Sequence, residues 1–335
     1  MYRTIIRTLF MAVMLVPLVA AAQTDAQLTQ YFAMPTYYNP AAVGDTDYIR
    51  LRGAARMQWV GIDNAPRSYI FTGDMPFKLL NRKFGVGLLV QQESLGLYRN
   101  LTAGAQFGFK FRLLKGVMTG GIQVGLLNEQ FKGSQVFIPD DDDYHQGTDE
   151  AIPMTDVSGN ALDLGIGLHY THRLFWAGVS LTHANSPTVT FTTEGGASGS
   201  GSTGGDGETA KNYEFQAPRT LYFMGGSNIA IKNTLFEVIP TFLVKSDFTF
   251  TGFDVTCRLR YNKFLSAGIG YRYKDAVSAM LGAEIKGFFL GYSYDYPTSE
   301  IAKASSGSHE IVAGYRLKLD FSEKNRNKHK SIRIM

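Results

Sequence analysis

From Tyr48 onward, apolar and polar residues of this chain alternate with a period of two. The stretch from Leu101 to Leu113 reads LTAGAQFGFKFRL, with leucine, alanine or phenylalanine at every odd position and glycine or a polar residue at every even one. Successive side chains of a β-strand point to opposite faces, whereas those of a helix repeat about every 3.6 residues. The pattern therefore predicts β-strands that are apolar on one face only.

The same alternation recurs in about fourteen segments of roughly ten residues each. They begin near Tyr48, Ser68, Phe84, Leu101, Val117, Ala161, Leu174, Thr220, Thr234, Thr249, Leu265, Val277, Phe288 and His309. A closed sheet with an even number of strands pairs every backbone N–H and C=O group inside a bilayer. We therefore predict an all-β fold, a transmembrane antiparallel outer-membrane β-barrel of about 14 strands over residues 47–321. A soluble β-sandwich is disfavoured by alternation over so many segments.

The connections between these segments differ in length from one side to the other. Short and mostly basic turns are expected at 81–83, 114–116, 172–173, 232–233, 262–263 and 286–287. The long connections, near 133–158, 185–218 and 298–308, all fall on the opposite side. Outer-membrane barrels have short periplasmic turns and longer extracellular loops. We therefore expect the long loops to be extracellular, and the last strand to pair with the first so that the sheet has no edge.

Both ends of the chain carry separate signals. Residues 1–22 have the features of a secretory signal peptide: Arg3 and Arg7, an apolar run, and three alanines before Gln23, where we expect cleavage and export to the outer membrane. We expect residues 23–46 to be an N-terminal periplasmic segment and residues 322–335 a basic periplasmic tail. The formal net charge is only +4, and the barrel region is near neutral, which argues against a nucleic-acid partner.

None of the short motifs indicates catalysis. Ser308, His309 and Glu310 are adjacent, but consecutive side chains of a strand point to opposite faces and so cannot form a triad. The acidic loop 140–150 resembles a calcium site only in its carboxylates, and a solvated acidic loop is favoured. The single cysteine, Cys257, excludes an intrachain disulfide and a cysteine zinc site. We expect no enzyme activity, catalytic residue, cofactor or metal, although His145 and His183 leave a surface hydrolase as a third hypothesis.

The polar face of the strands, which faces the barrel lumen, carries charges of both signs. The basic residues are Arg50, Arg52, Arg56, Lys110, Arg112, Arg258, Arg260, Arg272 and Arg316, and the acidic ones are Asp74, Asp163, Asp254, Glu284, Asp295 and Glu310. A selective pore sorts its charges at a constriction, whereas interleaved charges are typical of cross-strand ion pairs. We favour a braced interior, with a passive channel for small solutes as the alternative function.

Three motifs together resemble one known family. YYNPAAVG (37–44), RMQWVGIDNAPRSY (56–69) and YDYPTSEIAKASSGSHEIVAGYRL (294–317) are similar to the PorP/SprF family of Bacteroidota, and the resemblance runs from about Gln27 to Phe321. It implies a non-enzymatic barrel among outer-membrane lipids, within the type IX secretion system and gliding motility machinery. The implied partners are a periplasmic lipoprotein and other ring proteins, or secreted surface adhesins.

The motif positions that we select fall into three groups along the chain. They are Asn39, Pro40, Gly44, Arg56, Gln58, Trp59, Gly61, Pro66, Gly307, Ser308, His309, Glu310 and Tyr315. Two roles are open for them: folding and closure of the barrel, or contact with a protein partner.

Overall fold

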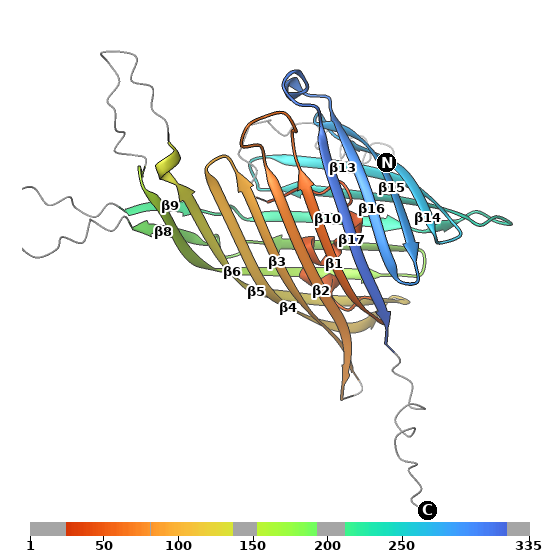
Figure 1. Cartoon of the computed structure of the whole chain (residues 1–335). Coiled ribbons are helices and arrows are strands. Elements are labelled where there is room, and N and C mark those ends of the chain that lie inside the picture. Colours follow the sequence, from red (N-terminus) through yellow and green to blue (C-terminus); the bar gives the residue numbers. More distant parts are fainter. Residues whose placement is uncertain (1–24, 81, 137–152, 193–211, 320–335) are drawn as a thin grey trace, which may run out of the picture.

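A computed structural model describes residues 25–80, 82–136, 153–192 and 212–319. Fourteen strands form a closed antiparallel barrel (Figure 1). They are β1 (Tyr48–Met57), β2 (Arg67–Leu79), β3 (Arg82–Leu95), β4 (Tyr98–Leu113), β5 (Gly116–Lys132), β6 (Asp156–Thr171), β7 (Phe175–Thr182), β10 (Thr220–Ser227), β12 (Phe236–Ser246), β13 (Thr251–Tyr261), β14 (Leu265–Arg272), β15 (Ala276–Ile285), β16 (Phe288–Pro297) and β17 (Ser308–Lys318). The predicted fold class and strand number are confirmed.

Two pairings close the ring. The first strand lies beside the last, with β1 and β17 in register from Tyr48 opposite Lys318 to Met57 opposite His309, as the sequence predicts. On the far side β10 pairs with both β7 and β12, because the intervening β8 (Thr188–Thr192) and β9 (Asn212–Gln216) form a hairpin of their own. The short β11 (Ile229–Ala230) only extends the edge of β12. Each barrel strand therefore has a neighbour on both sides.

The barrel wall is apolar on its outer face and polar on its inner face, which is the reverse of a water-soluble protein. On β4, Leu101 and Phe107 are about 40% exposed, whereas Thr102 and Gln106 between them are no more than 5% exposed. Apolar side chains point outward around the barrel, which is stable only where hydrocarbon replaces water. Among the residues that the structure describes, no helix is long and apolar enough to cross a membrane.

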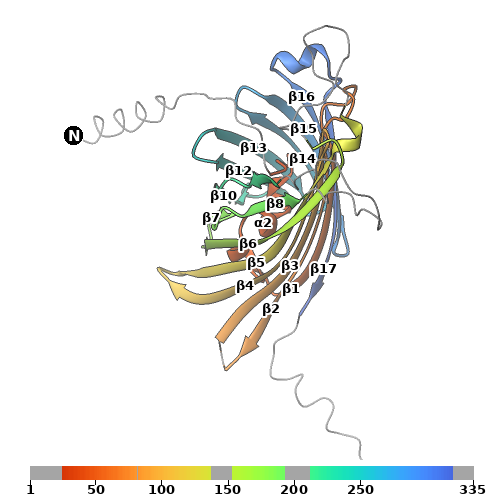
Figure 2. The same ribbon diagram turned by 90° about the vertical axis from the view of Figure 1, so that its left-hand side faces the viewer.

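Residues 25–46, which we call the plug, lie inside the barrel. They contain η1 (Tyr31–Ala33), α2 (Pro35–Tyr38) and η2 (Pro40–Ala42), and Figure 2 shows α2 enclosed by the strands. Our sequence-based expectation of a periplasmic segment at 23–46 is therefore replaced, for residues 25–46, by a location in the lumen. The reason is hydrophobic burial: Leu28, Tyr31 and Tyr38 are fully buried against apolar residues of the barrel wall.

The ends of the barrel differ as expected. At one end the strands are joined by tight turns, among them the β13–β14 turn, where Asn262 and Lys263 both have positive φ. At the other end lie the long connections with η3 (Gly133–Gln135) and η4 (Glu300–Lys303). The β8–β9 hairpin packs there on the inner face of β5 and β6, in a cluster of Leu127, Phe131, Val157, Val189, Phe191 and Ala217. The acidic loop at 140–150, including His145, lies outside the described residues.

Candidate functional site in the barrel lumen

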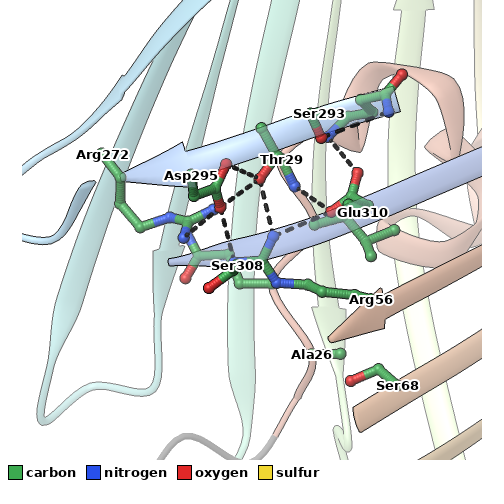
Figure 3. Close-up of polar contacts among 12 residues, drawn as sticks. Ala26, Thr29, Arg56, Ser68, Arg272, Ser293, Asp295, Ser308 and Glu310 are labelled. Atoms are coloured by element: carbon green, nitrogen blue, oxygen red, sulfur yellow. Dashed lines mark hydrogen bonds and ion pairs between the residues drawn. The ribbon is translucent and has the colours of Figure 1, made fainter. Parts of the chain in front are cut away.

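The first turn of the plug is held by a buried carboxylate of the last strand. The Glu310 carboxylate accepts hydrogen bonds from the backbone N–H groups of Thr29 (2.7 Å) and Gln30 (2.8 Å). The Thr29 hydroxyl donates to Asp295 at 2.7 Å (Figure 3). Arg56 donates to Asp295 at 2.8 Å and to Glu310 at 3.2 Å, and all three charged side chains are at most 4% exposed. This group ties the plug to strands β1, β16 and β17 at once.

The ion-pair network extends to a second arginine. Arg272 donates to Asp254 at 2.9 Å and lies 3.7 Å from Asp295. Asp254 in turn accepts a hydrogen bond from the Gln27 side chain of the plug. We call the five charged residues Arg56, Asp254, Arg272, Asp295 and Glu310 the latch. Its three carboxylates exceed its two guanidinium groups, and polar groups of the plug satisfy the remaining carboxylate oxygens, as buried charges require.

The latch lies at the closing seam of the barrel. Arg56 of β1 stands directly opposite Glu310 of β17, and Asp295 of β16 stands opposite Ser308. Ser308 and Glu310 face inward, whereas His309 points outward and hydrogen-bonds the Tyr292 hydroxyl at 2.7 Å. The three adjacent residues therefore form no catalytic triad.

A second anchor holds the start of the plug at the long-loop end. His183 lies between two carboxylates, with Nδ1 2.8 Å from Asp163 and Nε2 3.0 Å from Asp25 of the plug. Tyr222 donates to the Asp25 carboxylate, and Lys245 donates to the Asp25 carbonyl oxygen, each at 2.8 Å. The sequence offered His183 only as a loop residue of a surface hydrolase; the structure instead shows it buried just after β7, in contact with Asp25 of the plug.

The carboxylates around His183 decide its charge. Burial by itself lowers the pKa of His183, but Asp25 and Asp163 outweigh burial and raise the pKa to about 10. Burial by itself raises the pKa of Asp25. The charge and hydrogen bond of His183, the charge of Lys245 and the hydrogen bond from Tyr222 outweigh burial and hold the pKa of Asp25 well below its usual range. At neutral pH His183 is therefore an imidazolium that donates to both carboxylates. It has no free lone pair with which to act as a general base.

The second half of the plug packs so closely against the wall that only glycine fits there. A Cβ on Gly121 would lie 2.4 Å from Ala41, and one on Gly85 would lie 2.2 Å from the Val43 carbonyl oxygen. A Cβ on Gly167 would lie 2.1 Å from the Asn39 side chain. Glycines of β3, β5 and β6 thus let the plug backbone lie against the sheet.

The motif residues Asn39, Pro40 and Gly44 belong to this packed segment. The Asn39 side chain donates to the Leu168 carbonyl oxygen at 2.9 Å and accepts from Ala41 N–H at the start of η2, whose first residue is Pro40. Gly44 has φ +59°, and its N–H donates to Asp74 at 2.7 Å. Asp74 also pairs with Arg50 at 2.7 Å. The conformation of the YYNPAAVG motif therefore fits the plug to the wall.

The remaining motif residues meet mainly at the long-loop end. Gln58 N–H donates to the Pro66 carbonyl oxygen at 3.0 Å, which closes the β1–β2 hairpin. Trp59 N–H donates to the Ser308 hydroxyl at 3.1 Å. Gly61 and Gly307 both have positive φ, at +104° and +105°. A hydrogen bond joins the two motifs: Val60 N–H donates to the Gly307 carbonyl oxygen at 2.8 Å. Tyr315 lies apart from this group, with its ring centroid 4.4 Å from that of Phe288 near the short turns.

Cross-strand ion pairs brace the wall, as the interleaved charges predict. Arg50–Asp74, Arg260–Glu237 and Arg272–Asp254 each join residues directly opposite one another on neighbouring strands. Arg316–Glu284 connects β17 to β15. Sequence reasoning missed the role of the plug and of Glu237, because the strand pattern says nothing about what fills the lumen. The one sequence signal that could have indicated a buried segment is the set of apolar and aromatic residues within 26–43.

A closed antiparallel barrel with an apolar outer face and a charged, ion-paired interior is an outer-membrane β-barrel protein. The chain belongs to the family of type IX secretion system membrane proteins PorP/SprF, whose family model matches residues 20–315. No curated protein matches the chain.

Several solved barrels are similar in shape. The toluene transporter TbuX of Ralstonia pickettii has 13% sequence identity and a TM-score of 0.47, over 85% of this chain and 93% of its own. The outer membrane protein Omp33 of Acinetobacter baumannii has 8% identity and a TM-score of 0.44, over 80% and 97%. The translocator domain of the autotransporter NalP from Neisseria meningitidis has 11% identity and a TM-score of 0.44, over 81% and 88%. Function has to be derived from the residues of this chain itself.

Proposed function

We propose that this protein is a non-enzymatic docking component of the type IX secretion and gliding machinery, which binds periplasmic ring proteins, including a lipoprotein. We propose the anchoring of secreted surface adhesins as a second docking role. The observation that carries the proposal is the occupied lumen. A barrel whose interior holds its own N-terminal segment presents surfaces to partners rather than an open path to solutes.

The main alternative is a passive channel for small solutes. Against it, the plug runs from Asp25, at the level of the long loops, to Asp45, whose carboxylate accepts a hydrogen bond from Thr171 beside the short turns. Two separate groups of buried charges anchor it along this path, the latch and the pair between Asp25 and His183. Breaking these contacts would leave charges buried without partners, which opposes spontaneous opening.

The orientation in the membrane defines which partner meets which end. We take the short turns to face the periplasm, because outer-membrane barrels have short turns there. The last described residues of β17 then lead into the basic segment 322–335 on the periplasmic side, where it would attract an acidic partner. Ring proteins would contact the short turns, and secreted adhesins would contact the long loops.

Site-specific photocrosslinking in cells tests both docking roles. One crosslinker replaces Leu114, an 82% exposed residue of the β4–β5 turn, and a second replaces Glu300 in the long β16–β17 loop. We expect periplasmic ring proteins to be captured from position 114 and surface proteins from position 300. Capture of no type IX component from either position would contradict the proposal. Steady conductance of porin size in planar bilayers would instead establish the channel.

A further inference from the structure

The plug leaves one part of the lumen empty. Its second half lies against the glycines of β3, β5 and β6, and the opposite wall near the short turns is left uncovered. A cavity of about 240 Å³ remains there, which we call the vestibule. Its inner end is formed by Phe32 and Ala33 of the plug, and its sides by inward-facing residues of β1 and β12–β17.

The vestibule is strongly basic. Its lining includes five cationic residues, Arg52, Arg258, Arg260, Lys263 and Arg316, but only one carboxylate, Glu284. Glu284 pairs with Arg316, and Arg260 pairs with Glu237. Within the described part of the chain, Arg52, Arg258 and Lys263 form no salt bridge. Three positive charges in this partly enclosed space therefore have no direct salt-bridge partner among the described residues.

Two of these arginines are held against the plug, with hydrogen-bonding capacity left unused. The Arg258 guanidinium lies over the Phe32 ring, 3.3 Å from its centroid, and its buried Nε has no hydrogen-bond partner. Arg52 donates to the Ala33 carbonyl oxygen of the plug. Like charges in a poorly solvated space repel one another, and an anion between them would relieve this repulsion and supply acceptors. A guanidinium fork matches a carboxylate well.

The position of the vestibule selects the kind of anion. It lies on the lumen side of the strands, separated from the lipid by the barrel wall, so a lipid headgroup could reach it only by leaving the bilayer. Its mouth is at the short turns, where Lys263 stands in the β13–β14 turn. Phe264 and Phe289 add aromatic surface beside the charges, which suits a chain with apolar stems as well as carboxylates. A peptide that enters from the short-turn end meets both features.

We propose that the vestibule binds an acidic peptide segment of a partner protein. The inference deepens the proposed docking function and rests on it for the origin of the peptide. Lys263 and the unpaired Arg258 contact the carboxylates, and the aromatic residues contact the apolar parts of the segment. The filled side of the lumen gives the vestibule a rigid inner end, so the segment inserts without displacing the plug.

Two lysines at opposite ends of one strand provide a matched test. Lys263 precedes β14 and Lys274 follows it, and both have positive φ, at 56° and 58°. Only Lys263 lines the vestibule. The purified full-length barrel in detergent is titrated with a fluorescent glutamate-rich peptide. We expect saturable binding that weakens with salt, is reduced about tenfold or more by Lys263→Glu, and is unchanged by Lys274→Glu.

Three results would overturn the inference: no binding of the acidic peptide, equal binding of a lysine-rich peptide, or equal effects of the two substitutions. Inorganic phosphate that displaces the peptide at equal concentration would establish a small-anion site in its place. Each variant must retain heat-modifiable migration in gels as evidence that the barrel is folded. Lys263→Gln gives a second variant with a smaller change in charge. Capture of ring proteins from position 114 by the wild-type protein, together with failed peptide binding, refutes the vestibule and leaves the docking function standing. Peptide binding without capture of ring proteins refutes the docking function and leaves the vestibule standing as a peptide-binding site.

Discussion

Glu310 is the residue on which the hold on the plug depends most directly. Its carboxylate accepts from two plug N–H groups, at 2.7 and 2.8 Å, and from Arg56 at 3.2 Å, and the residue is only 1% exposed. Glu310→Ala leaves all three donors without this acceptor. Each unsatisfied buried donor costs about 1–3 kcal/mol, and removing one partner of a buried ion pair costs about 3–5 kcal/mol in total. We expect the first turn of the plug to be destabilised by about 3–5 kcal/mol.

Amide hydrogen exchange at Thr29 and Gln30 measures this loss. If exchange follows local opening, about 3–5 kcal/mol corresponds to roughly a hundredfold to several-thousandfold faster exchange. Glu300→Ala is the matched control, because that glutamate pairs with Lys303 in a loop where their side chains are 89% and 79% exposed. It should leave exchange unchanged. Exchange at Thr29 and Gln30 that stays within about threefold of the wild type in a folded Glu310→Ala barrel would refute the latch.

Three further predictions concern other parts of the lumen and the tail. Because the pKa of His183 is raised from 6.5 to about 10, the imidazolium stabilises the fold fully below about pH 6.5 and progressively less as pH rises towards 10. Thermal unfolding of the wild type should therefore shift to lower temperature over this range, and His183→Gln should flatten the pH profile; equal profiles would contradict this. Gly121→Ala forces a Cβ to 2.4 Å from Ala41 and should destabilise the protein by about 1–3 kcal/mol, whereas Gly120→Ala, with its nearest atom at 3.9 Å, should have little effect in the same unfolding assay. Removal of residues 322–335 should weaken copurification of a periplasmic lipoprotein, and unchanged copurification would exclude a role for the tail.

The sequence alone determined the barrel wall. Alternation with a period of two sets which side chains face lipid, so strand number, hairpin order and the β1–β17 seam could all be predicted. The opposite faces of His309 and Glu310 followed from the same rule. The inward charges could be recognised as cross-strand pairs, because a residue on one strand has only a few neighbours within reach on the next. Arg50 and Asp74 are such a pair.

Only the tertiary structure decided what occupies the lumen. Thr29 and Glu310 are 281 residues apart, and Asp25 and His183 are 158 residues apart, so no local pattern joins them. Residues 25–46 lack strand alternation, and their apolar and aromatic residues are compatible with several locations until the ring closes. Closure creates a space lined on one side by glycines and on the other by arginines. The plug fills the side where its backbone can approach the wall, and the vestibule remains on the other side.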